Sequence, residues 1–310
     1  MATRAHTVPR FYLSNFVSSE SEGAKDPFAW VATISSGEIR RRAPKNLSIA
    51  RGFYDGNGCF EEPTASLEAH LSKIEWAAAS AIKRLIALPA GSGAPVGPEI
   101  WRLLAWQAAR TPGWLDLVET WANEWDPNFD KAPVEGPPDG FDLIKDRNRG
   151  ICLELPSNGE RRTVQTMDEF RQLRRQGWKW TINHQDRLEM IHMQAWYFQA
   201  RHFARLSWVR LDAPLGDAFI TSDRGVTWMV DGFADTPPSA LRHPSAQIVA
   251  PLSRGVALIG RHPSQTDNLQ VTPREVNRFI ACTTSSWIAG PSKEVVETAL
   301  HDRAVTQVDQ

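Results

Sequence analysis

The clearest hydrophobic pattern in the chain has a helical period and lies in the first third of the sequence. Between residues 64 and 87, apolar side chains recur at intervals of three and four, which places them on one face of a helix. Thr64 is a suitable N-cap, and the glycines and prolines at 89–97 predict the end of this helix. The periodic positions are Leu67, Leu71, Ile74, Ala78, Ala81, Ile82 and Leu85.

Further helices are predicted on both sides of this one. Residues 9–17 suit a short helix opened by Pro9, because the fixed backbone of proline fits a first turn. A helix from about Glu99 to Arg110 ends at the pair Thr111-Pro112, which also suits the start of another helix reaching Trp125. Three later segments also read as helices, at 166–177, 184–206 and 272–290.

Both ends of the chain carry the shorter pattern of β-strands. Residues 28–44 predict a hairpin with a Ser-Gly turn, and its second strand ends in three arginines that suit a protected sheet edge. After residue 206, short apolar runs alternate with turn residues, at 206–211, 217–222, 247–252 and 255–260. The predicted fold class is α+β, with a helical middle section and an antiparallel sheet built from the N-terminal hairpin and the C-terminal strands.

Length and composition leave the domain count open and set limits on partners. The 310 residues are 42% hydrophobic, enough for a sizeable core, and residues 126–140 contain four prolines and two glycines that predict a loop or joint. The net charge of -1 argues against wholesale polyanion binding but leaves room for a local basic groove. The absence of a secretion signal and of an apolar run of about 20 residues predicts a cytoplasmic protein with no membrane partner.

Few signatures of cofactor or metal chemistry are present. The sequence contains no glycine-rich phosphate loop, no GxSxG and no HExxH, and its three cysteines show no CxxC spacing. Glu189 and His192 have the spacing used in di-metal helix bundles, but a second such pair is missing. We therefore predict no cofactor and leave a divalent metal open.

Five segments, taken in order, carry a family resemblance. Together they resemble the family catalogued as domain of unknown function 4238, from about His6 to Trp287, and this resemblance implies one domain, 1–310, without implying an activity. This chain has Ala5 where the family often has a first histidine, and Gly225 where it often has a proline, which is expected to loosen the turn after Asp223. The segments are HTVPRFYLSNF, PKNLSIARGFY, LEAHLSKIEWAAASAIKRL, LLAWQAARTPGW and AFITSDRGV.

The matching segments contain a coherent set of polar side chains. His6, Glu75 and Asp223 are the candidate catalytic residues, because an imidazole and carboxylates can exchange protons near neutral pH. Arginines can bind a phosphate through paired hydrogen bonds, a tyrosine can donate to a developing anion, and indoles can stack on bases. The candidate substrate-binding residues are Arg10, Tyr12, Arg110, Ser222, Trp106 and Trp208.

A structural interpretation stays open for each of these residues. His6 can anchor the terminus, Glu75 can form a purely structural ion pair with Arg110, and Ser222-Asp223 can form a tight turn. Most of the 13 tryptophans suit helix packing.

Two functions follow from these residues, and a third is weaker. The first is a hydrolase, for example a phosphodiesterase, that acts on a nucleotide or nucleic acid by His/carboxylate acid–base chemistry with arginine anion binding. The alternative is a non-catalytic protein that binds a small molecule in a pocket lined by Trp106, Trp114 or Trp208. A partner-binding role would need a large exposed apolar patch. The oligomeric state is not predicted.

Overall fold

The computed structural model describes most of both ends of the chain and part of its middle. The predictions for Thr64, for residues 112–122 and 126–140, and for the pair Glu189 and His192 fall outside the described residues. A single domain with a loop or joint at 126–140 therefore stays a prediction. The described residues are 4–51, 53, 67–92, 96–111, 123, 151–164, 166–181, 191, 195, 202–230, 233–234, 241, 243–265 and 271–308.

The predicted antiparallel sheet joins the two ends of the chain. The N-terminal hairpin consists of β2 (Ala29–Thr33) and β3 (Ile39–Arg42), and its turn contains Gly37 with φ of 66°. Strand β2 pairs with β14 (Trp287–Gly290), which in turn pairs with β9 (Thr221–Ser222). The order β3-β2-β14-β9 confirms the predicted edge position of the arginine-bearing strand.

A second, five-stranded antiparallel sheet contains most of the C-terminal apolar runs. Its order is β11-β10-β12-β13-β8. The predicted runs at 206–211, 247–252 and 255–260 are confirmed, whereas the run at 217–222 contributes only the two residues of β9. The strands are β8 (Ser207–Asp212), β10 (Thr227–Val230), β11 (Phe233–Ala234), β12 (Gln247–Ser253) and β13 (Val256–Arg261).

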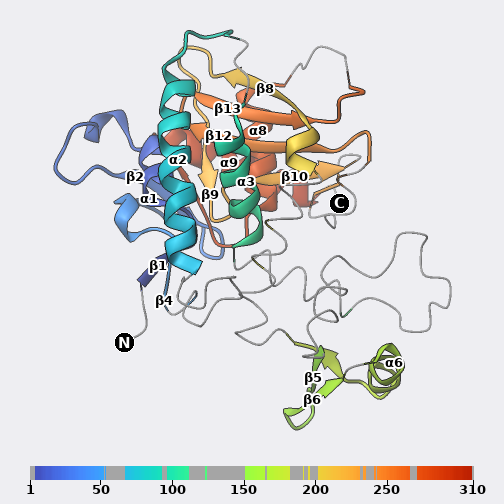
Figure 1. Ribbon diagram of the computed structural model, residues 1–310. Helices are drawn as coiled ribbons and strands as arrows, with labels where there is room; N and C mark the ends of the chain where they lie inside the picture. The colour runs from blue at the N-terminus through green and yellow to red at the C-terminus, as the bar shows by residue number, and fades with distance from the viewer. Residues whose placement is uncertain are drawn as a thin grey trace.

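This sheet separates two hydrophobic cores, because side chains of alternate residues on β12 and β13 point to opposite faces. Ala250 and Leu258 belong to the core that contains residues of α1, α2 and α3, whereas Val249 and Ile259 belong to the core that contains residues of α8 and α9. Figure 1 shows α2 and α3 in front of β12 and β13. Burial on both faces explains why these strands are continuous apolar runs rather than alternating ones. The helices are α1 (Arg10–Leu13), α2 (Leu67–Ala87), α3 (Pro98–Ala109), α8 (Pro273–Thr283) and α9 (Lys293–Val308).

The helix predicted over 272–290 is wrong in its second half. Helix α8 begins at the predicted cap Thr272, but it ends at Thr283, and the last four residues form β14. The hydroxyls of Thr283 and Thr284 bond to carbonyls of the preceding turn, which competes with helix continuation. The chain can then leave the helix, and the apolar Trp-Ile-Ala-Gly run forms a strand that pairs with β2 and β9. Helix α9 was not predicted.

The remaining elements are short. The strand predicted at 151–155 and the helix predicted at 166–177 are confirmed as β5 and α6, with Thr166 as N-cap and Gly177 at φ of 88° after the last turn. Strand β5 pairs with β6 and β7, and β1 pairs with β4. These elements are β1 (Arg4–His6), β4 (Ile49–Arg51), β5 (Ile151–Leu155), β6 (Glu160–Val164), β7 (Lys179–Trp180), α6 (Met167–Arg175) and 3-10 turns at Ser14–Phe16, Ser19–Ser21, Pro44–Asn46 and Phe203–Arg205.

Candidate functional site

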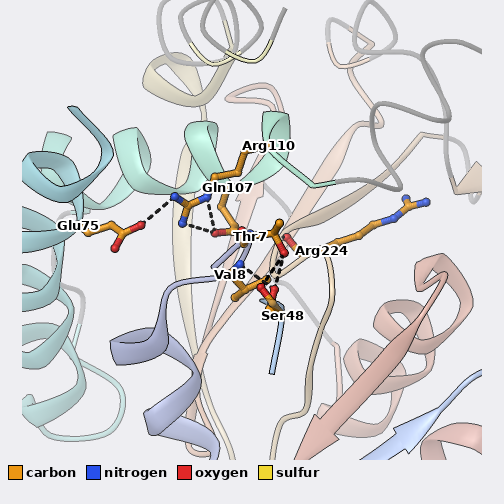
Figure 2. A network of polar contacts seen from close by, with 7 residues as sticks. All are labelled: Thr7, Val8, Ser48, Glu75, Gln107, Arg110 and Arg224. Carbon is orange, nitrogen blue, oxygen red and sulfur yellow. Dashed lines mark hydrogen bonds and ion pairs between the residues drawn. The ribbon is translucent and has the colours of Figure 1, made fainter. Parts of the chain in front are cut away.

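The predicted site segments meet at Gln107, a buried side chain of α3 that sequence reasoning missed. Its Nε2 donates to the carbonyl of Thr7 at 2.9 Å and to the carbonyl of Arg224 at 3.2 Å. Figure 2 shows both contacts, with the Arg224 side chain extending away from the network. A single amide nitrogen therefore holds the chain one residue after His6 and one residue after Asp223. The only sequence signal was the position of Gln107 within the LLAWQAARTPGW segment.

Arg110 and Glu75 lie on the other side of Gln107. The Arg110 Nη1 donates to Glu75 Oε1 at 2.8 Å, and its Nη2 donates to Gln107 Oε1 at 3.0 Å. The Arg110 side chain is 1% exposed and that of Glu75 is 27% exposed. The Glu–Arg pair suggested by the sequence is present, and it reaches the surface through Glu75.

The ring of His6 is oriented by a main-chain oxygen. Its Nδ1 lies 3.1 Å from the carbonyl oxygen of Leu47, and because a carbonyl only accepts hydrogen bonds, Nδ1 carries the proton. The lone pair of the neutral ring is then on Nε2. His6 is half-buried at the end of β1, where it pairs with Ile49 of β4. The arrangement both anchors the terminus and leaves a proton acceptor on the ring.

Ser48 fixes the backbone next to His6 and was also missed. It has a left-handed φ of 56°, which is unfavourable for a residue other than glycine. The Thr7 backbone nitrogen donates to the Ser48 carbonyl at 2.9 Å, and the Val8 nitrogen donates to Ser48 Oγ at 2.8 Å. The two hydroxyls of Thr7 and Ser48 lie 2.5 Å apart. These contacts hold the strained conformation in place.

Tyr12 is buried, and its hydroxyl contacts two main-chain oxygens. It donates to the carbonyl of Gly225 at 3.0 Å and also approaches the carbonyl of Pro251 on β12. Burial raises the pKa of Tyr12, so the phenol stays neutral. The side chain joins α1 to the turn after β9 and to the five-stranded sheet.

Asp223 is a buried carboxylate in the turn after β9. Its Oδ2 accepts hydrogen bonds from the Ser285 hydroxyl and from the Ser286 backbone nitrogen, both at 2.9 Å. Its Oδ1 is buried without a hydrogen-bond partner among the described residues. Burial raises the pKa of Asp223, although the Ser285 bond and the charge of Arg224 act in the opposite direction. This carboxylate is therefore more basic than an exposed one.

The comparison with protein families connects these contacts to the sequence. The model of a family described as protein of unknown function (DUF4238) matches residues 4–294. The chain belongs to the DUF4238 family. No curated protein and no solved structure matches it. In this DUF4238 protein, the quoted segments supply Thr7, Tyr12, Ser48, Glu75, Gln107, Arg110 and Gly225, which take part in the contacts described above.

Gly225 brings the turn after Asp223 close to Gln107. It has φ of 69°, a left-handed value that glycine adopts readily, whereas proline is fixed near -65°. A Cβ added here would lie 3.1 Å from Cγ of Gln107. The glycine lets the backbone approach Gln107 closely, and a looser turn at this position stays a prediction. Ser222, which is buried, accepts a hydrogen bond from the Arg224 nitrogen within the same turn at 3.3 Å.

The other predicted binding residues of the DUF4238 chain lie in different surroundings. Arg10 is exposed on α1. Trp106 is 3% exposed, and its ring lies 5.2 Å from that of His70 between centroids. Trp208 is half-buried, with its indole nitrogen donating to the Phe203 carbonyl at 3.0 Å. Trp114, the third indole of the predicted pocket, lies outside the described residues.

The described part of this family member contains neither a cluster of metal-ligating side chains nor a helix that could span a membrane. No group of three or more His, Cys, Asp and Glu side chains that could hold a metal ion occurs among the described residues. None of the described helices combines the length and the apolar character needed to cross a membrane.

Proposed function

We propose that this DUF4238 protein is a hydrolase that acts on a phosphate-bearing substrate, a nucleotide or a nucleic acid. The observation that carries the proposal is the convergence on Gln107, whose side chain binds the main chain beside His6 and beside Asp223 and contacts Arg110. Gln107 thus connects the main chain of two segments that are far apart in the sequence, each next to a residue that can transfer protons. A catalytic site needs titratable side chains held in fixed positions, which these contacts support.

The proposal gives His6 and Asp223 the proton-transfer roles. The His6 Nε2 accepts a proton because the Nδ1 proton is committed to Leu47. Burial raises the pKa of Asp223, which makes this carboxylate a stronger base than an exposed one. Glu75 neutralises Arg110 and holds it against Gln107, which makes Glu75 a positioning residue in this scheme.

The phosphate is assigned to arginines that are accessible. Arg10 is exposed on α1 and Arg224 is half-buried next to Asp223, so either guanidinium can meet an anionic oxygen. Arg110 is enclosed and contributes through Glu75. The near-zero net charge favours a single nucleotide or a short stretch of nucleic acid over a long polyanion.

The test is a hydrolysis assay on the full chain, with and without Mg²⁺ or Mn²⁺. The substrates are bis(p-nitrophenyl) phosphate, nucleoside triphosphates and a short single-stranded oligonucleotide. We expect turnover of at least one of them, reduced about 100-fold or more in His6→Ala, because a proton-transfer group typically contributes about 10²–10⁴-fold.

The matched control is His301→Ala, which removes an exposed histidine of α9 without touching the Gln107 network. It should retain wild-type turnover. Thermal unfolding of both variants separates loss of chemistry from loss of folded protein. Failure of the wild type to cleave any of the phosphate compounds in either metal condition would sink the proposed function.

A further inference from the structure

The loop between α8 and β14 brings an exposed serine onto Asp223. The Ser285 Oγ donates to Asp223 Oδ2 at 2.9 Å across 62 residues of sequence, so the contact is not a local turn. Asp223 is 9% exposed, whereas Ser285 is exposed. A buried carboxylate therefore holds the hydroxyl of a serine that faces solvent.

The second oxygen of Asp223 indicates that this carboxylate does more than hold the loop between α8 and β14 in place. Clamping the loop uses Oδ2 alone, which accepts the Ser285 hydroxyl and the Ser286 nitrogen. Oδ1 is buried and has no partner within the described structure, although buried polar atoms are almost always paired. A buried carboxylate oxygen without a donor leaves the charged form of Asp223 less stabilised, which favours the uptake of a proton.

We propose that Ser285 is the nucleophile of the hydrolase and that Asp223 takes its hydroxyl proton, an inference that rests on the proposed function. In the first step the Ser285 Oγ–P bond forms while the P–O bond to the leaving group breaks. The hydroxyl proton passes to Asp223 and is delivered to the leaving oxygen. In the second step water attacks phosphorus, the Oγ–P bond breaks, and a water proton returns to Ser285 through Asp223.

The geometry meets the requirements of an activated serine. A serine hydroxyl is a weak nucleophile until a base lies within about 2.6–3.2 Å, and the Asp223 oxygen lies at 2.9 Å. The Ser286 N–H fixes the orientation of the carboxylate. Burial of Asp223 strengthens it as a base, and Arg224, the next residue, adds a positive charge close to the arriving phosphate.

Another serine near a histidine gives a useful contrast. The Ser264 hydroxyl lies 2.7 Å from His262 Nδ1, but the backbone nitrogen of the same serine also donates to that Nδ1 at 3.2 Å. The two residues are only two positions apart, so this is a local turn contact. Ser264 is exposed like Ser285, which makes Ser264→Ala the matched control.

The experiment uses diisopropyl fluorophosphate as a covalent probe of the full chain. The Ser285 Oγ would displace fluoride and keep the diisopropylphosphoryl group, which intact-mass analysis and peptide mapping detect. We expect one adduct, at Ser285, in the wild type and in Ser264→Ala. Ser285→Ala should take up none, and labelling of Asp223→Asn should slow about 100-fold, as for loss of a general base.

The outcomes separate this inference from the proposed function. An adduct on another residue, or none at all, overturns the assignment of Ser285. So does wild-type hydrolysis of bis(p-nitrophenyl) phosphate by Ser285→Ala, and in that case the hydrolase function survives. If Ser285 is labelled but the protein cleaves no phosphate compound, the result supports Ser285 as a nucleophile and rules out the proposed phosphate-bearing substrate. Thermal unfolding of each variant confirms that the folded state is retained.

Discussion

Removing the charge of Glu75 should destabilise the protein more than the exposure of Glu75 suggests. The Glu75→Gln variant keeps a hydrogen-bond acceptor for Arg110, but it leaves a buried guanidinium without its counter-charge. The Arg110 side chain is 1% exposed, and its other contacts here are to the neutral Gln107. Breaking a buried pair costs about 3–5 kcal/mol, and exposed pairs contribute about 0–1 kcal/mol. Because Glu75 is 27% exposed, we expect about 2–3 kcal/mol, between these limits.

The assay is urea unfolding at neutral pH, with the midpoint and slope of the transition measured together. The control is Glu297→Gln, which breaks an exposed pair with Lys293 on α9 and should cost about 0.3–0.5 kcal/mol. In a double-mutant cycle with Arg110→Met, the double variant should be less destabilised than the sum of the single variants by about 0.5–3 kcal/mol. Additive effects, or a Glu75→Gln cost no larger than that of Glu297→Gln, would refute the buried-charge reasoning.

Three further predictions concern the same region. Tyr12→Phe should cost about 1–3 kcal/mol in urea unfolding, because the buried carbonyls of Gly225 and Pro251 lose their donor; an unchanged midpoint would contradict this. Gly225→Ala should destabilise more than Gly37→Ala, since both glycines have left-handed φ but only Gly225 abuts Gln107; equal losses of unfolding free energy would show that the close approach is unimportant. The raised pKa of Asp223 means that its stabilising contribution is complete below the ordinary pKa of aspartate and is lost as pH rises through the folded-state value. Asp223→Asn should therefore gain stability relative to wild type as pH rises from about 4 to 8, by about 1.4 kcal/mol per unit of pKa displacement, and a pH-independent difference would contradict the raised pKa.

The elements that the sequence predicts correctly bury either one face or both faces against neighbouring elements. Helix α2 buries one face, so its period is visible, and β12 and β13 bury both faces, so they appear as apolar runs. The sequence predicts a helix across β14 because no proline or glycine separates its four residues from α8, and only pairing with β2 and β9 identifies them as a strand. Helix α9 was missed because it buries few apolar positions, among them Val296 and Ala299.

In the candidate site, too, some contacts could be predicted from the sequence and others could not. The Glu75–Arg110 pair was predictable, since opposite charges on two adjacent helices suggest a partner. Gln107 and Ser48 were not, because the Gln107 side chain binds the carbonyl of Thr7, 100 positions away, and the Ser48 hydroxyl binds the amide of Val8, 40 positions away. Main-chain carbonyls and amides carry no sequence signal, so a side chain that binds them cannot be recognised from residue types alone.

This use of main-chain partners also separates residues that hold the fold from residues that remain available for chemistry. The Tyr12 hydroxyl and the Gln107 amide are engaged by the chain itself, and so is the Arg110 guanidinium. His6 Nε2 and Asp223 Oδ1 have no bond to any described residue, although both side chains are firmly oriented through their other atom. A group that is oriented yet keeps an unused polar atom can take up a proton without first breaking a contact of the folded state. Substitutions at His6 and Asp223 should therefore reduce turnover by more than any loss of folded protein explains, whereas those at Tyr12 and Arg110 should change activity only as far as they reduce the folded population.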